Sequence, residues 1–142
     1  PFEEHIKDLI RDMDLEERVH FLGVIPHNEI PYYINNSDIG IGRITHKGMW
    51  RYMIPVKCLE YMSCKKPFIT TPISTDILLH NDVGLKLRKD FSQKELTDKI
   101  IRLIEDKNLQ KSLGANGLEK INKKFLWENI MSKFDKEIRE II

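Results

Sequence analysis

The sequence is poor in the residues that build covalent or metal-linked sites. Its two cysteines, Cys58 and Cys64, lie six positions apart, a spacing that fits no zinc motif, so we expect two reduced thiols. The five histidines are scattered and form no H-E-x-x-H arrangement. No apolar run approaches the ~20 residues that a membrane span needs. These absences argue against a disulfide scaffold, a zinc site and a membrane-spanning protein.

An excess of charge of one sign is also lacking. The chain has 23 Lys and Arg against 22 Asp and Glu, a net charge of +1. Nucleic-acid-binding domains usually concentrate basic residues on one face, so no nucleic-acid partner is expected. Hydrophobic residues make up 41% and charged residues 32%, which is typical of a globular domain. A length of 142 residues suits one domain.

The beginning of the chain lacks an initiator Met and a basic-then-apolar leader, because it reads Pro1-Phe2-Glu3. We therefore expect a segment of a longer protein, and the two reduced cysteines favour a cytoplasmic location.

Short β-rich runs alternate with amphipathic helical patterns along the chain. Strands are predicted over 18–23, 38–43, 66–71 and 83–88, the last as a half-exposed edge strand. Helices are predicted over 2–13, 28–35 and 55–64, with three more in the C-terminal third. This alternation predicts an α/β fold, a parallel sheet flanked by helices, over one domain spanning 1–142.

Several residues support particular details of this reading. Ser92 and Glu95 have the spacing of a capping box, and Phe91 and Leu96 that of a hydrophobic staple. The glycines of the 38–43 strand suggest a backbone that something approaches closely.

Other residues mark expected weak points and core contacts. Gly114 and Gly117 are expected to weaken their helix by roughly 1 kcal/mol each relative to Ala. Aromatic side chains are expected in the core or under the sheet, namely Tyr32, Tyr33, Trp127 and Phe134.

The start of the 55–64 helix is the best candidate for a binding site. Ligands of open parallel sheets bind at the carboxyl ends of the strands, and a helix N-terminus offers free N–H groups and partial positive charge to a phosphate. Lys57 and Glu60 lie three apart and share a face. An acidic residue one turn into such a helix can accept hydrogen bonds from ribose hydroxyls. The alternative is a solvated i,i+3 ion pair that contributes a few tenths of a kcal/mol.

The same segment resembles a known family. The run PVKCLEYMSCKKPFI from Pro55 to Ile69 is similar to the P-x-K-x-x-E-Y-M-A-x-G-K-P segment of retaining "group 1" glycosyltransferases of the GT-B fold. Weaker similarities flank it at VHFLG (19–23), IPYY (30–33), SDIGI (37–41) and FLW (125–127). The resemblance covers essentially the whole chain. It implies a Rossmann-like domain, the C-terminal donor-binding half of a GT-B fold.

The resemblance also implies roles for particular residues. Glu60 matches the second glutamate of the family's E-x7-E motif, which holds ribose hydroxyls of a nucleotide-diphosphate sugar. Pro55 and Val56 would lie by the diphosphate, and Lys57 is a further candidate for the same site. Gly42 and Arg43 would border it. The implied partners are this donor and a glycan or lipid-linked acceptor. The resemblance implies no cofactor or metal, and no catalytic residue is assigned.

The sequence departs from the family pattern at three places. The first glutamate of E-x7-E is replaced by Tyr52, and the glycine-rich stretch before the helix is replaced by residues 49–54. Lys65 stands where the family usually has Gly, which suggests a helix end capped by charge rather than by a left-handed glycine. Sugar identity and mechanism therefore stay open.

In the family, the donor domain begins with two further strands, and an acceptor-binding domain precedes them. Neither the strands nor that domain has a counterpart in these 142 residues. Without those neighbours the 18–23 strand would lack a partner, so we expect a rearranged sheet or self-association through an unpaired edge.

Two other functions remain open. One is a non-catalytic α/β interaction or regulatory module, which Tyr52 favours. The weaker one is a flavodoxin-like receiver, which would need an acidic cluster that 18–23 lacks. Lys120, Lys123 and Lys124 are read as a solvated face, with peripheral contact to an anionic membrane as the alternative.

Overall fold

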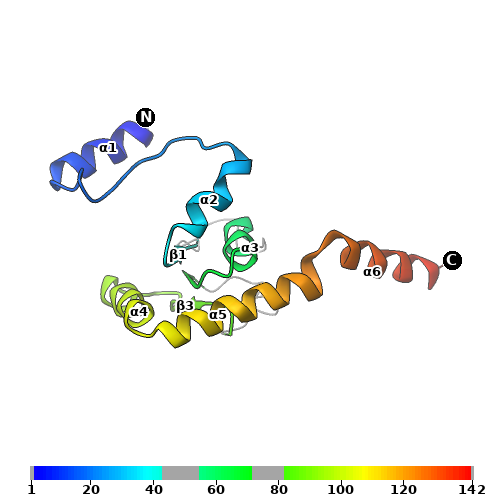
Figure 1. The fold of residues 1–142 in the computed structure, drawn as a ribbon. Coiled ribbons are helices and arrows are strands. Elements are labelled where there is room, and N and C mark those ends of the chain that lie inside the picture. The colour runs from blue at the N-terminus through cyan, green and yellow to red at the C-terminus, as the bar shows by residue number, and fades with distance from the viewer. Residues whose placement is uncertain (1, 43–54, 72–81, 142) are drawn as a thin grey trace. The chain divides into compact units, whose positions relative to one another are not determined.

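The computed structural model describes residues 2–42, 55–71 and 82–141 (Figure 1). Residue contacts divide the chain into two compact units, residues 1–30 and 31–142. The prediction of one domain over 1–142 stays a prediction.

The first unit contains helix α1 (Phe2–Asp12). Lys7 stabilises it through an i,i+4 ion pair with Glu3, 2.7 Å between Nζ and the carboxylate. The helix ends near Asp14, whose φ of 52° is left-handed. The Lys7 ammonium lies 5.7 Å from the ring centroid of Phe21, a cation–π contact.

The predicted strand over 18–23 is wrong. Residues 16–18 form a turn, in which the Arg18 N–H donates to the Leu15 carbonyl at 2.9 Å, and residues 19–23 are irregular. A strand needs a neighbour for its backbone groups, and in the described parts of the chain no segment pairs with this one. Val19, Phe21 and Leu22 are accordingly exposed. The apolar alternation of residues 18–23 is typical of a strand, but within 2–42, 55–71 and 82–141 these residues have no neighbouring strand with which to pair.

The second unit is built around a parallel sheet. Within the described residues it has the strands β1 (Gly40–Ile41), β2 (Phe68–Thr70) and β3 (Leu85–Lys86), in the order β1-β2-β3. Gly40 pairs with Phe68, and Ile69 pairs with Leu85. The predicted parallel α/β sheet is confirmed, and β3 lies at its edge among the strands that the structure describes, as predicted.

Helices precede and follow these strands. A 3-10 turn (His27–Glu29) leads into α2 (Ile30–Asn35), and the others are α3 (Val56–Ser63), α4 (Gln93–Glu105), α5 (Lys107–Lys120), a π turn (Ile121–Phe125) and α6 (Trp127–Arg139). The three C-terminal helices match those predicted. In Figure 1, α5 continues through the π turn into α6.

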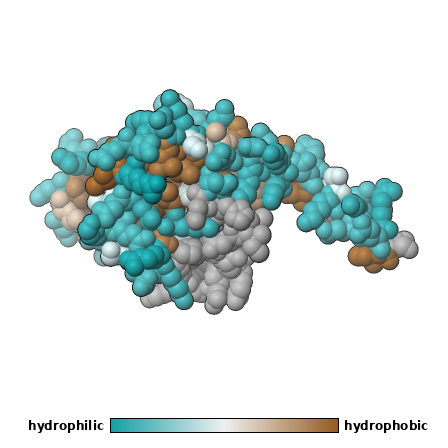
Figure 2. Space-filling model, turned by 90° about the horizontal axis from the view of Figure 1, so that it is seen from below, coloured by the Kyte–Doolittle hydropathy of each residue, from teal (hydrophilic) through white to brown (hydrophobic). Residues whose placement is uncertain are grey.

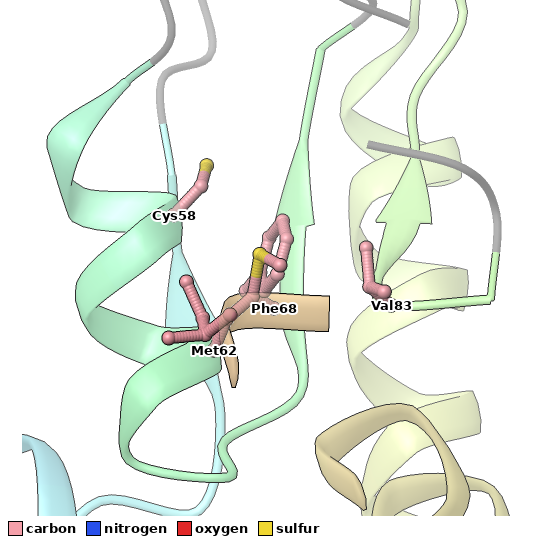
Figure 3. Packing of buried hydrophobic residues seen from close by; sticks show 5 residues of the cluster. Cys58, Met62, Phe68 and Val83 are labelled. Atoms are coloured by element: carbon pink, nitrogen blue, oxygen red, sulfur yellow. The ribbon is translucent and has the colours of Figure 1, made fainter. Parts of the chain in front are cut away.

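Two hydrophobic clusters cover the two faces of β2. On one face, Phe68 packs with Cys58 and Met62 of α3, with Val83, which precedes β3, and with Ile121 of the π turn (Figure 3). Ile69 faces the other side and packs with Leu87, Leu103 and Leu113. Successive strand residues point to opposite faces, so β2 is buried on both sides. This is the usual environment of a central strand in a parallel sheet.

Gly114 and Gly117 let α5 lie against the end of α3. A Cβ built on Gly114 would fall 2.1 Å from the Lys65 carbonyl oxygen, and one on Gly117 would fall 3.1 Å from Cγ of Met62. Each glycine lowers helix propensity, but Gly114 also occupies a position where a Cβ does not fit, and at Gly117 a Cβ would be tight against Met62. The sequence predicted the loss of helix propensity at these glycines but not the close contact of α5 with α3.

Lys65 contradicts the expectation of a charge-capped helix end. Its φ is 55°, the left-handed conformation in which the family has Gly. The Lys66 N–H donates to the Tyr61 carbonyl at 2.8 Å, and the Lys65 N–H donates to the Met62 carbonyl at 3.1 Å. These two bonds define a Schellman motif. Lys65 therefore has the backbone conformation that glycine favours.

The N-terminus of α4 has half of the predicted capping box. Ser92 Oγ accepts from the Glu95 N–H at 3.2 Å, but the Glu95 carboxylate accepts instead from the backbone N–H and Nε of Arg88, at 3.0 and 2.8 Å. Phe91 and Leu96 both pack on the Ile69 cluster, and their direct contact as a staple stays a prediction.

The expectation of core aromatic residues is wrong for four side chains. Trp127 of α6 is 70% exposed and Phe134 is 55% exposed. Tyr32 and Tyr33 of α2 are also exposed and contact each other edge to face, 5.6 Å between centroids. A hydrophobic patch is visible at the C-terminal end of the chain in Figure 2, at the right. The helical periodicity was read correctly, but periodicity alone does not tell whether a partner covers the apolar face.

Candidate functional site

The carboxyl ends of β1 and β2 meet the first turn of α3. Gly42 follows β1, and its N–H donates to the Ile69 carbonyl at 2.8 Å. A Cβ on Gly42 would lie 3.1 Å from Cys58 Sγ and 3.2 Å from the Thr70 side chain. The structure therefore brings Gly42, the start of α3 and the end of β2 together, as the ligand-site rule for parallel sheets requires.

The N-terminus of α3 is preceded by Pro55, which has an extended conformation (φ −66°, ψ 116°) and gives the helix no side-chain cap. The Pro55 carbonyl accepts from the Cys58 N–H at 2.9 Å. The first N–H groups of a helix point out of its end and carry partial positive charge. Val56 and Lys57 are exposed, so this end faces outward. Arg43 and Tyr52 lie outside the described residues.

Glu60 lies one turn into the helix and is half-buried. It shares a face with Lys57, three positions earlier. The opposite face carries Cys58 and Met62, both 0% exposed. The predicted orientation of α3 is thus confirmed, while the nucleotide-binding roles of Pro55, Val56, Lys57, Glu60, Gly42 and Arg43 stay predictions.

Tyr61 is a site-supporting residue that the sequence reading missed. Its hydroxyl donates to the Ile41 carbonyl at 3.1 Å. A Cβ on Gly40 would fall 2.7 Å from its ring. Burial, with smaller contributions from Cys58 and Glu60, raises the pKa of the Tyr61 hydroxyl, which stays protonated and able to donate. The signal in the sequence was Gly40, which predicted a close approach without naming the approaching residue.

Cys58 is a structural thiol. Burial raises its pKa to about 11, although a hydrogen bond with Thr70 acts in the opposite direction. A thiol is nucleophilic as the thiolate, so Cys58 is inert at neutral pH. The buried side chains of Thr70 and Thr71 continue this edge of the site.

No described helix has both the length and the apolar character needed to cross a membrane. Across residues 2–42, 55–71 and 82–141, His, Cys, Asp and Glu side chains form no group of three that could hold a metal ion.

Comparison with known proteins gives a consistent answer. A family model described as "Glycosyl transferases group 1" matches residues 1–120. The chain is 27% identical over 115 residues to the capsular polysaccharide biosynthesis glycosyltransferase CapM of Staphylococcus aureus, covering 76% of this chain and 28% of that protein. It is 25% identical over 132 residues to N-acetyl-alpha-D-glucosaminyl L-malate synthase of Bacillus anthracis, covering 92% and 32%. The chain thus spans about a third or less of these relatives.

Two solved structures share the fold. Sucrose-phosphate synthase from Thermosynechococcus elongatus superposes with a TM-score of 0.78 at 22% identity, over 97% of this chain and 34% of that one. The C-terminal domain of a glycosyl transferase group 1 family protein from Francisella tularensis superposes with a TM-score of 0.68 at 24% identity, over 87% and 62%.

The family model covers most of the chain, and the sheet that carries the α3 site matches these two structures. The chain therefore belongs to the group 1 glycosyltransferases and has the fold of the C-terminal domain of a GT-B enzyme.

Proposed function

We propose that this chain binds a nucleotide-diphosphate sugar at the N-terminus of α3 and forms the donor half of a hexosyltransferase. Glycosyltransferases of this family use nucleotide-sugar donors. The observation that carries the proposal is the meeting of Gly42, the outward-facing start of α3 and Glu60 at the carboxyl edge of the sheet.

Each residue has a stated part in the proposal. The N–H groups of Val56 and Lys57, which follow Pro55 at the start of α3, attract the diphosphate together with the Lys57 ammonium. The Glu60 carboxylate accepts hydrogen bonds from the ribose hydroxyls. Gly42 lets the donor approach the end of β1, with Arg43 beside it. These groups position the donor and stabilise the departing diphosphate.

The transfer step needs an acceptor and an acceptor-binding domain. We propose that the acceptor is a glycan or a lipid-linked sugar, and that transfer retains the anomeric configuration. The relative named for capsular polysaccharide biosynthesis is consistent with a glycan acceptor. The proposed location is cytoplasmic, with peripheral membrane contact of the longer protein. Because the chain spans about a third or less of these relatives, we expect weak nucleotide binding and no transfer by the 142 residues alone.

Calorimetric titration of the chain with UDP and with GDP tests the site. Glu60→Ala should weaken binding about tenfold or more, because a hydrogen bond to a charged group contributes ~1.5–3 kcal/mol. Glu137→Ala is the matched control, since Glu137 lies on α6 and its partner is Lys133. Binding that is unchanged in Glu60→Ala contradicts the assignment.

A second candidate function is a non-catalytic module that keeps the fold. The observation that favours it is Tyr52, where the family's first E-x7-E glutamate would contact the donor sugar. A longer protein with both domains separates the two. Release of free nucleotide from a nucleotide-sugar in the presence of acceptor supports the enzyme, and nucleotide binding without release supports the module.

A further inference from the structure

A polar surface pocket lies at the end of the strands opposite to the proposed donor site. It has a volume of about 220 Å³ and is lined by Asp82, Asn116, Glu119, Lys120, Lys123 and Lys124. Asp82 precedes β3, whose first residue Leu85 pairs with Ile69. The pocket is therefore beside the amino ends of the strands, whereas Gly42 and the start of α3 lie at the carboxyl ends.

The residues that line this pocket are fixed by contacts between α5, the π turn and the segment before β3. Asn116 Nδ2 of α5 donates to the Asp82 carbonyl at 2.9 Å, joining α5 to the approach of β3. Ile121 and Phe125, the two ends of the π turn, pack in the Phe68 cluster. Lys123 and Lys124 lie between these two anchors and are exposed. π turns occur frequently at functional sites, and here the turn places lysines from two successive turns around one hollow.

Positive charge predominates in the pocket. Lys123 is paired with Glu119. Among the described residues, Lys120 and Lys124 form no ion pair, although the Asp82 carboxylate favours the charged form of Lys120. Partial burial lowers the pKa of Lys120, and the neighbouring ammonium groups of Lys124 and Lys86 lower it further. Like charges held this close repel each other until an anion lies between them.

We propose that this pocket binds a phosphate group, supplied either by free phosphate or by the headgroup of an anionic lipid. Lysine binds phosphate as a point charge, and a phosphate carries about −1.5 to −2 at neutral pH, enough to offset the ammonium groups of Lys120 and Lys124. The pocket has room for a phosphate with its water. This site shares no residue with the proposed donor site, so each proposal can be tested independently of the other.

The test compares the unmodified 142-residue chain with a double variant, Lys120→Gln with Lys124→Gln. Two probes are used: inorganic phosphate by calorimetry, and sedimentation with vesicles of phosphatidylcholine alone or mixed with phosphatidylglycerol. The double variant should bind about tenfold more weakly, since each exposed charge contributes a few-fold. The control is Lys94→Gln with Lys111→Gln, which removes the same charge from α4 and α5 outside the pocket.

A variant that should strengthen phosphate binding distinguishes loss of the site from loss of folding. Glu119→Gln releases Lys123 from its ion pair and should tighten binding about two- to threefold, which a damaged fold would not do. Binding of inorganic phosphate that follows these variants identifies a free phosphate ligand. Binding confined to phosphatidylglycerol vesicles that follows them identifies the headgroup. Binding to neither probe, or binding equal in both double variants, overturns the proposal.

Discussion

The Tyr61 hydroxyl donates a 3.1 Å hydrogen bond to the carbonyl of Ile41, while the Tyr61 ring lies against Gly40. The Tyr61 side chain thus contacts both residues of β1 and joins α3 to this strand. Because Tyr61 directly follows Glu60, this contact also sets where the Glu60 carboxylate stands relative to the carboxyl edge of the sheet.

Removal of that hydroxyl should loosen α3. We expect Tyr61→Phe to lower the free energy of unfolding by about 1 kcal/mol, since the Ile41 carbonyl loses its side-chain donor. It should also weaken UDP binding while the ring contact with Gly40 remains. Urea denaturation and calorimetry measure the two effects. Tyr32→Phe, at an exposed ring, is the control that should change neither.

Gly114 should not tolerate a methyl group. Gly114→Ala gains about 1 kcal/mol of helix propensity, but its Cβ would fall 2.1 Å from the Lys65 carbonyl oxygen. Overpacking against backbone typically costs ~1–3 kcal/mol or more, so a net loss of stability is expected in urea denaturation. Ser112→Ala, on the exposed side of α5, should be neutral or slightly stabilising. A stabilised Gly114→Ala protein would contradict the close approach of α5 to α3.

Lys65 offers the opposite case, a residue that glycine should improve. Lys65→Gly should raise the free energy of unfolding by about 1 kcal/mol, because a left-handed φ strains residues with a Cβ. Lys65→Ala is the informative control: it removes the charge but keeps the Cβ. Equal stability of Lys65→Ala and the unmodified chain identifies backbone strain as the cause, whereas a loss in Lys65→Ala would restore the charge-capping explanation.

The two cysteines should differ in reactivity. Cys58 is fully buried with a pKa of about 11, whereas Cys64 is partly exposed. At pH 8 a disulfide reagent should therefore modify one thiol quickly and the second only on unfolding. Cys64→Ser should remove the fast phase, and a fast phase that survives would contradict the packing of α3.

Cys58 also makes stability depend on alkaline pH. Its pKa in the folded chain is above its ordinary value of 9.0, so the unfolded chain loses this proton first. Its contribution to stability is complete below pH 9 and decreases as the pH rises toward 11. The difference in stability between pH 8 and pH 10.5 should be smaller in Cys58→Ala, measured by urea denaturation.

Local patterns predicted much of this fold. The alternation of strands and helices gave the parallel sheet, and the apolar positions of α3 gave Cys58 and Met62 as its buried face. Ser92 and Phe91 marked the start of α4 because capping and stapling depend on neighbours only a few residues apart. The proposed site at the start of α3 rests on equally local features, one helix end and one strand, and it stays a prediction.

Contacts between distant segments escaped prediction. The role of Tyr61 depends on Gly40, and that of Gly114 depends on the Lys65 carbonyl, so neither is visible within one window of sequence. The pattern at 18–23 and the apolar positions of Trp127 and Phe134 were real, but burial requires a partner that a pattern cannot supply. Lys65 shows a further limit, since surrounding hydrogen bonds can impose a conformation that its own side chain disfavours.

The double-sided burial of β2 has a consequence for motion. Both of its neighbours are strands, and Phe68 and Ile69 are sealed by separate clusters. Its amide protons should therefore exchange with solvent only when the whole second unit opens, whereas the exposed turns of α6 exchange through local fraying. The three residues of β2 should therefore be the last amides of the second unit to exchange.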